Sequence, residues 1–221
     1  MSDLAVDICI VTATRMEAER FVSVLTESVI EKHGSRRVWT GNYGGTRVAV
    51  VTTGIGPARA AGAAELIAAL PGCPAVLNVG LAGSLATGMH AHEWYEITHV
   101  SAGEDDGEQI HLNTVGLMPQ ATLVTVKKAV CDRGRARALH MRHGVELVDM
   151  ECYHLCRAAR SRGLRIYALK MISDAADIFT VRDVIRSLKL YRKSCNTIVA
   201  KWMEIYLMTR NSDGTTEYSD T

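Results

Sequence analysis

The sequence has no excess of charge of either sign. It contains 25 Lys and Arg residues against 24 Asp and Glu residues, and its formal net charge is +1 with the eight His neutral. No long run of Lys and Arg occurs in it. A chain this close to neutrality has no long-range field that would attract nucleic acid or an anionic membrane. We therefore expect no nucleic-acid partner.

Long apolar runs and an export signal are also missing. No apolar run approaches the roughly 18 to 20 residues that a membrane span needs, and the N-terminus has no basic segment followed by an apolar one. The cysteines form no CxxC pair and no disulfide-scaffold spacing. We therefore expect a cytoplasmic protein with no membrane span and with reduced thiols.

The apolar residues that are present form a pattern of alternating strands and helices. Hydrophobic residues make up 48% of the 221 residues, which is enough for one sizeable core. Short β-branched segments predict strands at residues 6–11, 37–43, 48–53, 75–79, 94–100, 122–126 and 166–172. Segments with helical periodicity predict helices at residues 17–25, 57–70, 150–162 and 181–208.

This order of elements predicts an α/β fold, with one central, mixed and largely parallel twisted sheet flanked by helices. We expect a single domain over residues 1–208 and a polar, flexible tail over residues 209–221. In the last helix, Ile185 and Trp202 belong to an apolar stripe that we expect to pack on the sheet. Ligands of open α/β sheets bind outside the carboxyl ends of the strands. The candidate loops are therefore residues 12–17, 53–59, 78–85 and 173–177.

The first of these loops carries a carboxylate with two interpretations. Thr14 and Glu17 have the spacing of a helix capping box, in which each side chain hydrogen-bonds the backbone of the other residue. Glu17 also shares its helical face with Phe21 and Leu25, so its carboxylate is directed toward the apolar side. A carboxylate held there has a raised pKa and can act as a base near neutral pH.

The second loop, residues 54–59, contains a Gly-Ile-Gly-Pro sequence. A dinucleotide fingerprint needs glycine where Arg59 stands and an acidic residue further on, so a nicotinamide cofactor is disfavoured. Its free amides are suited to an anion or a polar group, and a simple strand-to-helix turn with Pro57 at the first helical position explains the sequence equally well.

Three further segments place small or acidic residues at strand and helix ends. Residues 80–83 read Gly-Leu-Ala-Gly, which allows close approach of a ligand or of a neighbouring element. Asp174 directly follows a buried strand, where it could also cap a turn. Glu151 begins a helix with apolar neighbours on its face, so it is a second inward acid, although a helix first turn also favours a carboxylate.

We expect no metal site. His90, His92 and Glu93 form a small cluster, but no later set of residues has matching ligand spacing, and a solvated loop explains the cluster better.

Taken together, four motifs resemble the nucleoside phosphorylase and nucleosidase superfamily. They are Gly-Ile-Gly at 54–56, Asn-Val-Gly-Leu-Ala-Gly at 78–83, Val-Asp-Met-Glu at 148–151 and Ile-Ser-Asp-Ala-Ala-Asp at 172–177. The last two are most similar to 5'-methylthioadenosine/S-adenosylhomocysteine nucleosidases. Residues 123–126, followed by 148–151, are closer to the hopanoid-associated phosphorylase branch. The resemblance implies a homodimer or larger homo-oligomer, a small nucleoside substrate and no cofactor.

The resemblance also implies roles for individual residues. Asp174 matches the acid that delivers a proton to purine N7, and Ser173 fixes the position of that acid. Glu151 matches the acid that binds the ribose hydroxyls, and Met150 packs against the sugar. Glu17 is nearest to the carboxylate that orients the attacking water.

Other residues of the motifs complete or limit these assignments. Gly54, Ala82 and Gly83 complete the implied substrate-binding set. Glu19 remains an alternative to Glu17 as the residue that orients the water.

Two departures from the family pattern bear on nucleophile and substrate. Phosphorylases carry arginine where Asn78 stands and serine where Leu81 stands, so water is favoured over phosphate, although Arg59 could still supply a positive charge. The base-stacking loop is aromatic in the methylthioadenosine enzymes, whereas residues 125–130 contain no aromatic residue.

We therefore expect hydrolysis of a 5'-modified adenine nucleoside. The alternatives are a phosphate-dependent phosphorylase of the hopanoid-associated type, acting on a bulky 5'-substituted adenosine, and a nucleoside-binding protein without catalysis. Three inward acids argue against a pure binder, because buried carboxylates without partners are costly.

Overall fold

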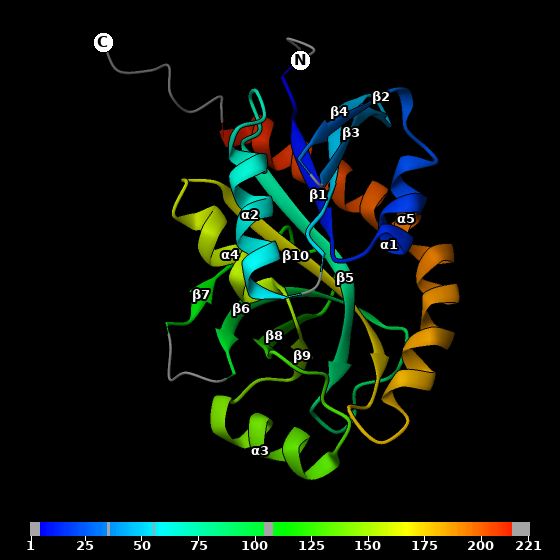
Figure 1. The fold of residues 1–221 in the computed structure, drawn as a ribbon, viewed down its shortest axis with the longest axis vertical. Helices are drawn as coiled ribbons and strands as arrows, with labels where there is room; N and C mark the ends of the chain where they lie inside the picture. Colours follow the sequence, from blue (N-terminus) through cyan, green and yellow to red (C-terminus); the bar gives the residue numbers. More distant parts are fainter. Residues whose placement is uncertain (1–4, 35, 55, 104–107, 214–221) are drawn as a thin grey trace.

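The computed structural model has one large mixed sheet with helices on both faces (Figure 1). It describes residues 5–34, 36–54, 56–103 and 108–213. The fold class predicted from the sequence, a single α/β domain with a mixed central sheet, is confirmed.

The strands and helices alternate along most of the chain. The strands are β1 Ile8–Thr12, β2 Thr26–His33, β3 Arg36–Tyr43, β4 Thr46–Thr52, β5 Ala75–Ser84, β6 Trp94–Ala102, β7 Ile110–His111, β8 Gln120–Thr125, β9 Leu147–Asp149 and β10 Arg165–Asp174. The helices are α1 Arg15–Val22, α2 Pro57–Ala68, α3 Arg133–His143, α4 Cys152–Arg160 and α5 Thr180–Asp213.

Part of the sheet closes on itself. Strand β10 pairs with β5 and with β6, while β6 pairs with β8, β8 with β9, and β9 with β5. These five strands form a ring, and β1, β4, β3 and β2 extend the sheet from β5. The β5–β10, β5–β1 and β1–β4 pairings are parallel. The carboxyl ends of β1, β4, β5 and β10 therefore lie at the same edge of the sheet.

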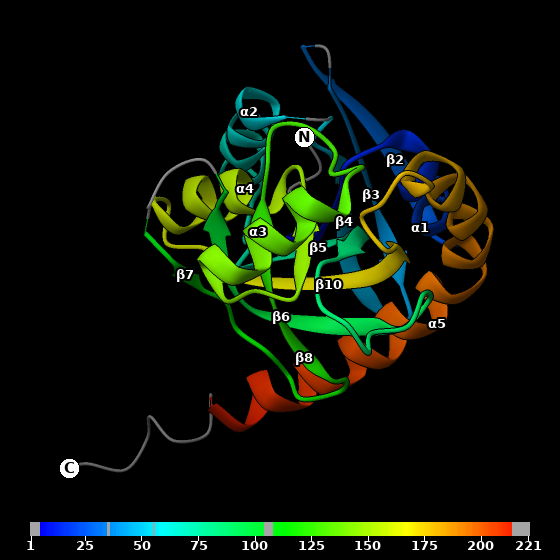
Figure 2. The same ribbon diagram turned by 90° about the horizontal axis from the view of Figure 1, so that it is seen from below.

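Helices cover both faces of the sheet, as Figure 2 shows with α2 and α4 on one side and α1 and α5 on the other. Along β1, Cys9 and Val11 join the core under α2 and α4, whereas Ile8 and Ile10 join the core under α1 and α5. Every residue of β1 is buried. The near-continuous apolar sequence of this strand is explained by burial on both faces.

The sequence pattern predicted most elements but missed an edge strand, two short strands and one helix. All seven predicted strands and all four predicted helices are present, with boundaries shifted by a few residues. The edge strand β2 and the short strands β7 and β9 were not predicted, nor was α3. Helix α3 buries only Ala136 and Leu139, so it has no apolar stripe for a periodicity argument to detect.

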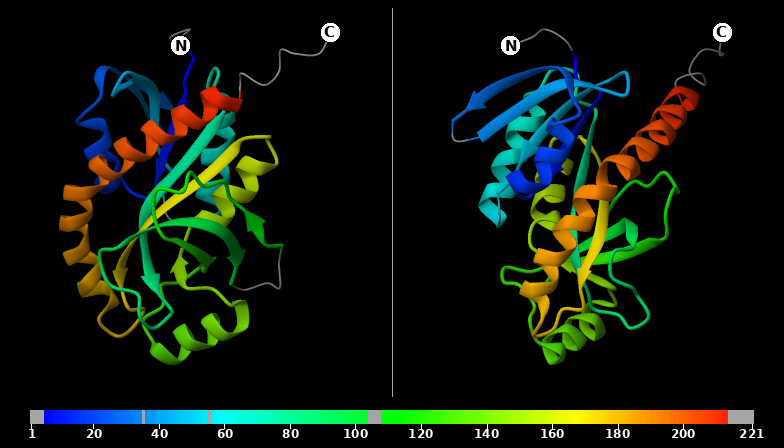
Figure 3. Two further views of the ribbon diagram at one scale, coloured as in Figure 1. Left: turned by 180° about the vertical axis from the view of Figure 1, so that it is seen from behind. Right: turned by 90° about the vertical axis from the view of Figure 1, so that its right-hand side faces the viewer.

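Helix α5 is longer than predicted and only part of it packs on the sheet. It bends and runs diagonally across the molecule (Figure 3). Trp202 is buried, but Ile185, expected on the same packed stripe, is 65% exposed and lines a hollow with Met16 and Arg20 of α1. The helix continues to Asp213, past the predicted domain end at 208, and residues 214–221 of the expected tail lie outside the described residues.

Within the part of the chain that the structure describes, no helix combines the length and apolarity of a membrane span.

The aromatic cluster under α5 provides a test of this packing. The Trp202 ring stacks on Tyr206 with centroids 5.2 Å apart and meets Tyr167 edge-on at 4.9 Å. Trp202→Ala should lower the free energy of unfolding by about 3–5 kcal/mol, measured by denaturant titration, because it leaves a large cavity. The exposed neighbour Lys201→Ala should change it by less than about 0.5 kcal/mol. Equal effects of the two variants would contradict the packing of α5.

Candidate active site

A cavity of about 260 Å³ lies where β5, β9 and β10 end and where α1 and α5 begin. We call it the central cavity. Its carboxyl side chains are Glu17, Asp149, Glu151 and Asp174. No Lys, Arg or His is among its described lining residues. Although the chain is close to neutral overall, these acids lie together at the carboxyl ends of the strands. This is where ligands of open α/β sheets bind.

Glu17 satisfies both interpretations of its sequence pattern. Its Oε2 accepts hydrogen bonds from the Thr14 backbone N and Oγ1, each at 2.8 Å, and its own backbone N donates to Thr14 Oγ1 at 3.3 Å. The capping box is therefore real, and the same carboxylate is only 5% exposed at the cavity wall. Burial raises the pKa of Glu17, against the lowering effect of the Thr14 hydrogen bonds and of the charge on Lys170.

Glu19, the alternative to Glu17, lies outside the cavity. Its side chain is 48% exposed and forms ion pairs with Arg15 at 3.5 Å and with Arg192 at 3.9 Å. Only Glu17 of these two acids faces the central cavity.

Glu151 stands at the start of α4 without serving as its cap. Its side chain makes no cap hydrogen bond, whereas the Asp149 carboxylate accepts hydrogen bonds from the Cys152 backbone N at 3.2 and 3.3 Å. The helix first turn therefore does not account for Glu151. Burial, followed by the charge on Asp149, raises the pKa of Glu151 to about 8, although Lys170 acts in the opposite direction.

A buried ion pair lies at the edge of the central cavity. Lys170 Nζ is 2.8 Å from Asp149 Oδ2, and the two side chains are 3% and 2% exposed. Asp149 also accepts a hydrogen bond from Thr125 Oγ1 at 2.6 Å. Burial lowers the pKa of Lys170, but the charges of Asp149 and its other neighbours raise it by more, so the pKa lies above its usual value and the amine stays charged.

Asp174 is held by three residues on neighbouring turns. Its Oδ1 accepts hydrogen bonds from the Ala176 backbone N at 2.8 Å and from Thr180 Oγ1 at 2.9 Å. Its Oδ2 lies 2.5 Å from Ser173 Oγ, which is also 3.2 Å from the Ala82 carbonyl oxygen. If Asp174 is protonated, it can donate to Ser173 Oγ while that hydroxyl donates to Ala82. The pair can therefore accommodate a proton.

Two glycines leave room for these acids. A Cβ at Gly83 would lie 3.1 Å from Asp174 Oδ1, and one at Gly80 would lie 3.2 Å from Glu17 Oε1. The close approach predicted for residues 80–83 is therefore to the carboxylates of the central cavity. These glycines lie within β5, which continues to Ser84, rather than in the loop predicted there.

The remaining wall of the central cavity is mostly aliphatic. Met150, Val126, Val130 and Val148 line it, and no aromatic side chain is among its described lining residues. Residues 125–130, which contain no aromatic residue, contribute Val126, Ala129 and Val130 to this wall.

Most of the site residues predicted from the sequence meet in this cavity, and Gly54 does not. Asp174, Glu17, Met150, Glu151, Ser173, Ala82 and Gly83 all line it. Gly54 instead packs against Arg59, whose Nη1 would lie 3.2 Å from a Cβ at that position. The Gly54 loop leads into α2, with Gly56 as its N-cap and Pro57 as its first residue, so its structure is the simple strand-to-helix turn.

Sequence reasoning missed Asp149, Lys170 and Thr180 as parts of the site. A lysine in the otherwise apolar strand Ile-Tyr-Ala-Leu-Lys-Met-Ile is a signal that could have indicated a buried ion pair. Thr180 gave no such signal, because its contact with Asp174 depends on the turn that leads into α5.

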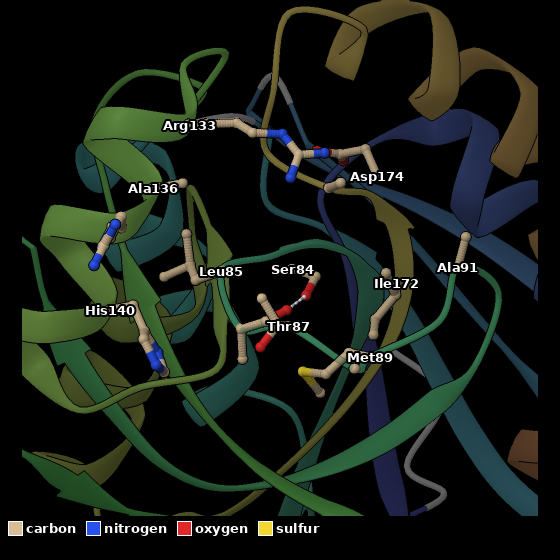
Figure 4. Close-up of a pocket in the computed structure, with 14 residues that line it drawn as sticks. Ser84, Leu85, Thr87, Met89, Ala91, Arg133, Ala136, His140, Ile172 and Asp174 are labelled. Carbon is tan, nitrogen blue, oxygen red and sulfur yellow. Dashed lines mark hydrogen bonds between the residues drawn. The ribbon is translucent and has the colours of Figure 1, made fainter.

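A second and larger cavity, of about 750 Å³, adjoins the central cavity at Asp174. Figure 4 shows Arg133 and His140 on the α3 side of it and Met89 and Ile172 on the opposite side. Apart from Asp174 it has no carboxyl group among its described lining residues. Because its four carboxyl groups set it apart, the smaller cavity is the candidate active site. No cluster of His, Cys, Asp and Glu able to hold a metal occurs in the described ranges.

Comparison with known proteins agrees with this architecture. The sequence profile of a family described as the phosphorylase superfamily matches residues 7–107 and 106–203. No curated protein matches the chain.

Several solved structures share the fold at low sequence identity. A Helicobacter pylori MTAN mutant with 5'-methylthioadenosine in the active site has 15% identity and a TM-score of 0.84, over 91% of this chain and 99% of that chain. A futalosine hydrolase mutant from Helicobacter pylori has 15% identity and a TM-score of 0.82, over 90% and 99% of the two chains. The 5'-methylthioadenosine/S-adenosylhomocysteine nucleosidase of Neisseria meningitidis, in complex with methylthio-immucillin-A, has 17% identity and a TM-score of 0.83, over 89% and 98%.

The raised pKa of Glu151 predicts a specific dependence of stability on pH. Glu151 keeps its proton in the folded chain up to about pH 8, while the unfolded chain loses it near the ordinary carboxyl pKa. This contribution to stability is complete below the unfolded pKa and is lost as the pH rises toward and through about 8. Glutamine cannot ionise, so Glu151→Gln should remove this loss of stability at high pH.

Thermal unfolding between pH 5 and pH 9 measures this effect. The melting temperature of the unmodified protein should fall by several °C more than that of Glu151→Gln, since about 1 kcal/mol shifts it by roughly 2–4 °C in a domain of this size. The exposed control Glu19→Gln should follow the unmodified protein. Parallel curves for Glu151→Gln and the unmodified protein would show that Glu151 ionises normally.

Proposed function

The chain belongs to the phosphorylase superfamily, and we propose that within it this protein hydrolyses the N-glycosidic bond of a 5'-modified adenine nucleoside. The observation that carries the proposal is the meeting of Glu17, Glu151 and Asp174 in one cavity. Cleaving this bond leaves a cationic, oxocarbenium-like sugar and a poor leaving group. The enzyme must therefore protonate the base and stabilise positive charge on the sugar.

Asp174 is the proton donor in this proposal. Its side chain lies at the cavity wall, buried at 5% exposure, and its contact with Ser173 Oγ provides a place for the proton. Thr180 Oγ1 and the Ala176 backbone N hold the other oxygen, so the carboxyl plane is fixed relative to the base. Purine N7 takes the proton as the bond to the sugar breaks.

The sugar lies among the other acids. Burial, followed by the charge on Asp149 and, less strongly, that on Glu17, raises the pKa of Glu151 to about 8, although the charge on Lys170 lowers it. The carboxylates of Asp149 and Glu17 therefore repel a further negative charge beside them. A positive charge that develops on the ribose relieves this repulsion, whereas the neutral substrate does not. The acids therefore favour the transition state over the ground state, as electrostatic catalysis requires.

Water is the nucleophile in this proposal, and Glu17 accepts its proton. The raised pKa of Glu17 suits a base that acts near neutral pH. Phosphate is disfavoured because the described cavity wall offers four carboxyl groups and no cationic side chain. Arg59, the one cation that the sequence offered for phosphate, packs on Gly54 outside the cavity lining.

The 5' substituent is expected to be bulky and apolar next to the sugar. The aliphatic wall, including Val184 and Leu188 of α5, supports this. The similarity of fold to a nucleosidase solved with 5'-methylthioadenosine supports the apolar character of the substituent but not its bulk. A phosphate-dependent enzyme of the hopanoid-associated type remains the second candidate, favoured by residues 123–126 and 148–151. A homodimer, as the family resemblance implies, is part of the proposal.

Release of adenine from 5'-alkylthioadenosines in phosphate-free buffer tests the proposed reaction. Asp174→Asn should lower kcat by about 10² to 10⁴, because asparagine keeps the geometry and cannot deliver the proton. Asp183→Asn, an acid near the start of α5 that pairs with Arg182 on the surface, is the control and should keep normal activity. The sugar product should be the free 5-alkylthioribose. A sugar 1-phosphate formed only with added phosphate would favour the phosphorylase, and near-normal activity of Asp174→Asn would rule out its role.

The two glutamates at the start of α1 can be separated in the same assay. Glu17→Gln should reduce kcat by about 10² or more, because the attacking water loses its base. Glu19→Gln should leave kcat within about twofold, because Glu19 is exposed and outside the cavity. If Glu19→Gln is the harmful change, the base has been assigned to the wrong residue.

A further inference from the structure

Four exposed apolar side chains come from one short stretch of the chain, at the turn before α5 and near the start of that helix. Ile178, Phe179, Val181 and Ile185 are 77%, 47%, 66% and 65% exposed. They are four of the eleven large apolar side chains that are exposed in the described part of the chain. Single exposed apolar residues are common on protein surfaces, whereas a group of them indicates a surface that contacts something else.

Two of these residues border the buried face of α5. Val184 and Leu188 line the central cavity, and Tyr191 is fully buried. Val181 and Ile185, four residues apart, lie at the edge of this apolar face and remain mostly exposed. The apolar stripe of α5 is therefore wider than the packing inside the chain requires.

Cations continue the surface of α5 beyond the exposed apolar residues. Arg182, Arg186, Lys189 and Lys193 follow one another at spacings of four, three and four residues, and all are exposed. Asp183 lies 2.9 Å from Arg182 Nε and 3.9 Å from Arg186 Nη1, so it offsets part of this charge. The side of α5 that faces water thus has aliphatic residues next to a row of cations.

Helix α3 extends this basic surface. Its first residue adjoins the turn before α5, because Arg133 Nη2 is 3.1 Å from Asp177 Oδ2. Figures 1 and 3 show both segments at one end of the molecule, with β2 near the opposite end. We call residues 132–143 and 177–193 together the α3–α5 surface.

The overall neutrality of the chain is the sum of two unequal parts. The α3–α5 surface contains nine Lys and Arg against three Asp and Glu, whereas the whole chain contains 25 against 24. The rest of the chain is therefore net acidic. The expectation from net charge, that no field attracts an anionic membrane, does not hold at this end of the molecule. A local excess of cations attracts an anionic surface and orients the protein on it.

We propose that the α3–α5 surface docks on an anionic lipid membrane as a peripheral contact. The four exposed apolar side chains enter the headgroup region, and the cations of α5 and α3 lie level with the lipid phosphates. A second copy of the chain fits this surface less well, because a two-fold contact would bring like charges together. Nucleic acid offers phosphates but no apolar layer for protruding aliphatic side chains.

Docking of this kind needs neither a substrate nor the proposed reaction. Because Val184 and Leu188 line the central cavity from the same turns of α5, docking would hold that cavity close to the bilayer. The separation would be about one helix diameter, roughly 10 Å.

Sedimentation with lipid vesicles tests the proposal. At about 0.1 M salt, the affinity for vesicles with about one third phosphatidylglycerol should exceed that for pure phosphatidylcholine by about tenfold or more, because several cations act together. The difference should shrink at about 0.5 M salt. Equal binding to both kinds of vesicle, or no binding to either, would overturn the proposal.

Two pairs of substitutions locate the contact. Ile178→Ser combined with Phe179→Ser removes two of the exposed apolar side chains. Arg186→Glu combined with Lys189→Glu reverses two of the cations. Each pair should lower the affinity for the anionic vesicles by about tenfold or more.

The hairpin of β2 and β3 provides a matched control for each pair. Val29 and Ile30 are 44% and 59% exposed on β2, and Lys32 and Arg37 are exposed partners across the two strands. Val29→Ser with Ile30→Ser, and Lys32→Glu with Arg37→Glu, should bind the vesicles within about twofold of the unmodified protein. Circular dichroism and thermal unfolding show whether each variant is folded. An equal loss of binding in folded controls would overturn the assignment to the α3–α5 surface.

Two further measurements test the other occupants of this surface. Self-association in the absence of lipid that Ile178→Ser with Phe179→Ser abolishes, measured by sedimentation velocity, would assign the surface to a second copy. Binding of a DNA duplex without binding of vesicles would assign it to nucleic acid. Either result would overturn membrane docking. Adenine release is measured without lipid, so a failure of docking is distinct from a failure of the proposed function.

Discussion

The buried charge balance around Lys170 is the constraint on which the active site depends. Asp149, Glu17 and Glu151 are buried near one another, and the charge on Lys170 acts on all three. Removing several carboxylates from water is costly unless each has a partner. Asp149 has the ion pair with Lys170 and a hydrogen bond from Thr125, while burial and then the charge on Asp149 raise the pKa of Glu151. A cationic transition state of the proposed reaction would offset the negative charge gathered here.

Structural and chemical duties are combined in the same residues. Thr14 and Glu17 cap α1, and the cap holds the Glu17 carboxylate at the cavity wall. The Asp149 carboxylate accepts a hydrogen bond from the Cys152 backbone N, at the first residue of α4. The neighbouring Glu151 side chain therefore has no capping role. The hydrogen bonds at the start of a helix therefore hold an acid in a fixed position. Loss of either cap would be expected to disturb the positions of the cavity carboxylates as well as the stability of the helix.

Two helices that the sequence separates widely bring charges of opposite sign close together. Helices α1 and α5 begin at the central cavity and also line a hollow of about 580 Å³. Acids line the central cavity, whereas Arg20, Lys189, Arg192 and Lys193 line the other hollow. The two hollows share Met16 and Leu188 as lining residues, in a chain of net charge +1.

The sequence by itself determined the α/β fold, because β-branched strands buried on both faces and amphipathic helices leave clear periodic signals. It also indicated Glu17, Glu151 and Asp174, three of the four carboxyl groups of the central cavity, because each stands at the end of an apolar element. Elements without an apolar stripe, such as α3 and the edge strand β2, could not be predicted in this way.

Only the tertiary structure decided which groups meet. It excluded Gly54 and Glu19 from the cavity, paired Lys170 with Asp149, and brought Thr180 to Asp174. The physical reason is that electrostatic and hydrogen-bond partners depend on distances across the closed ring of strands and between helix ends. Residue spacing along the chain does not encode those distances.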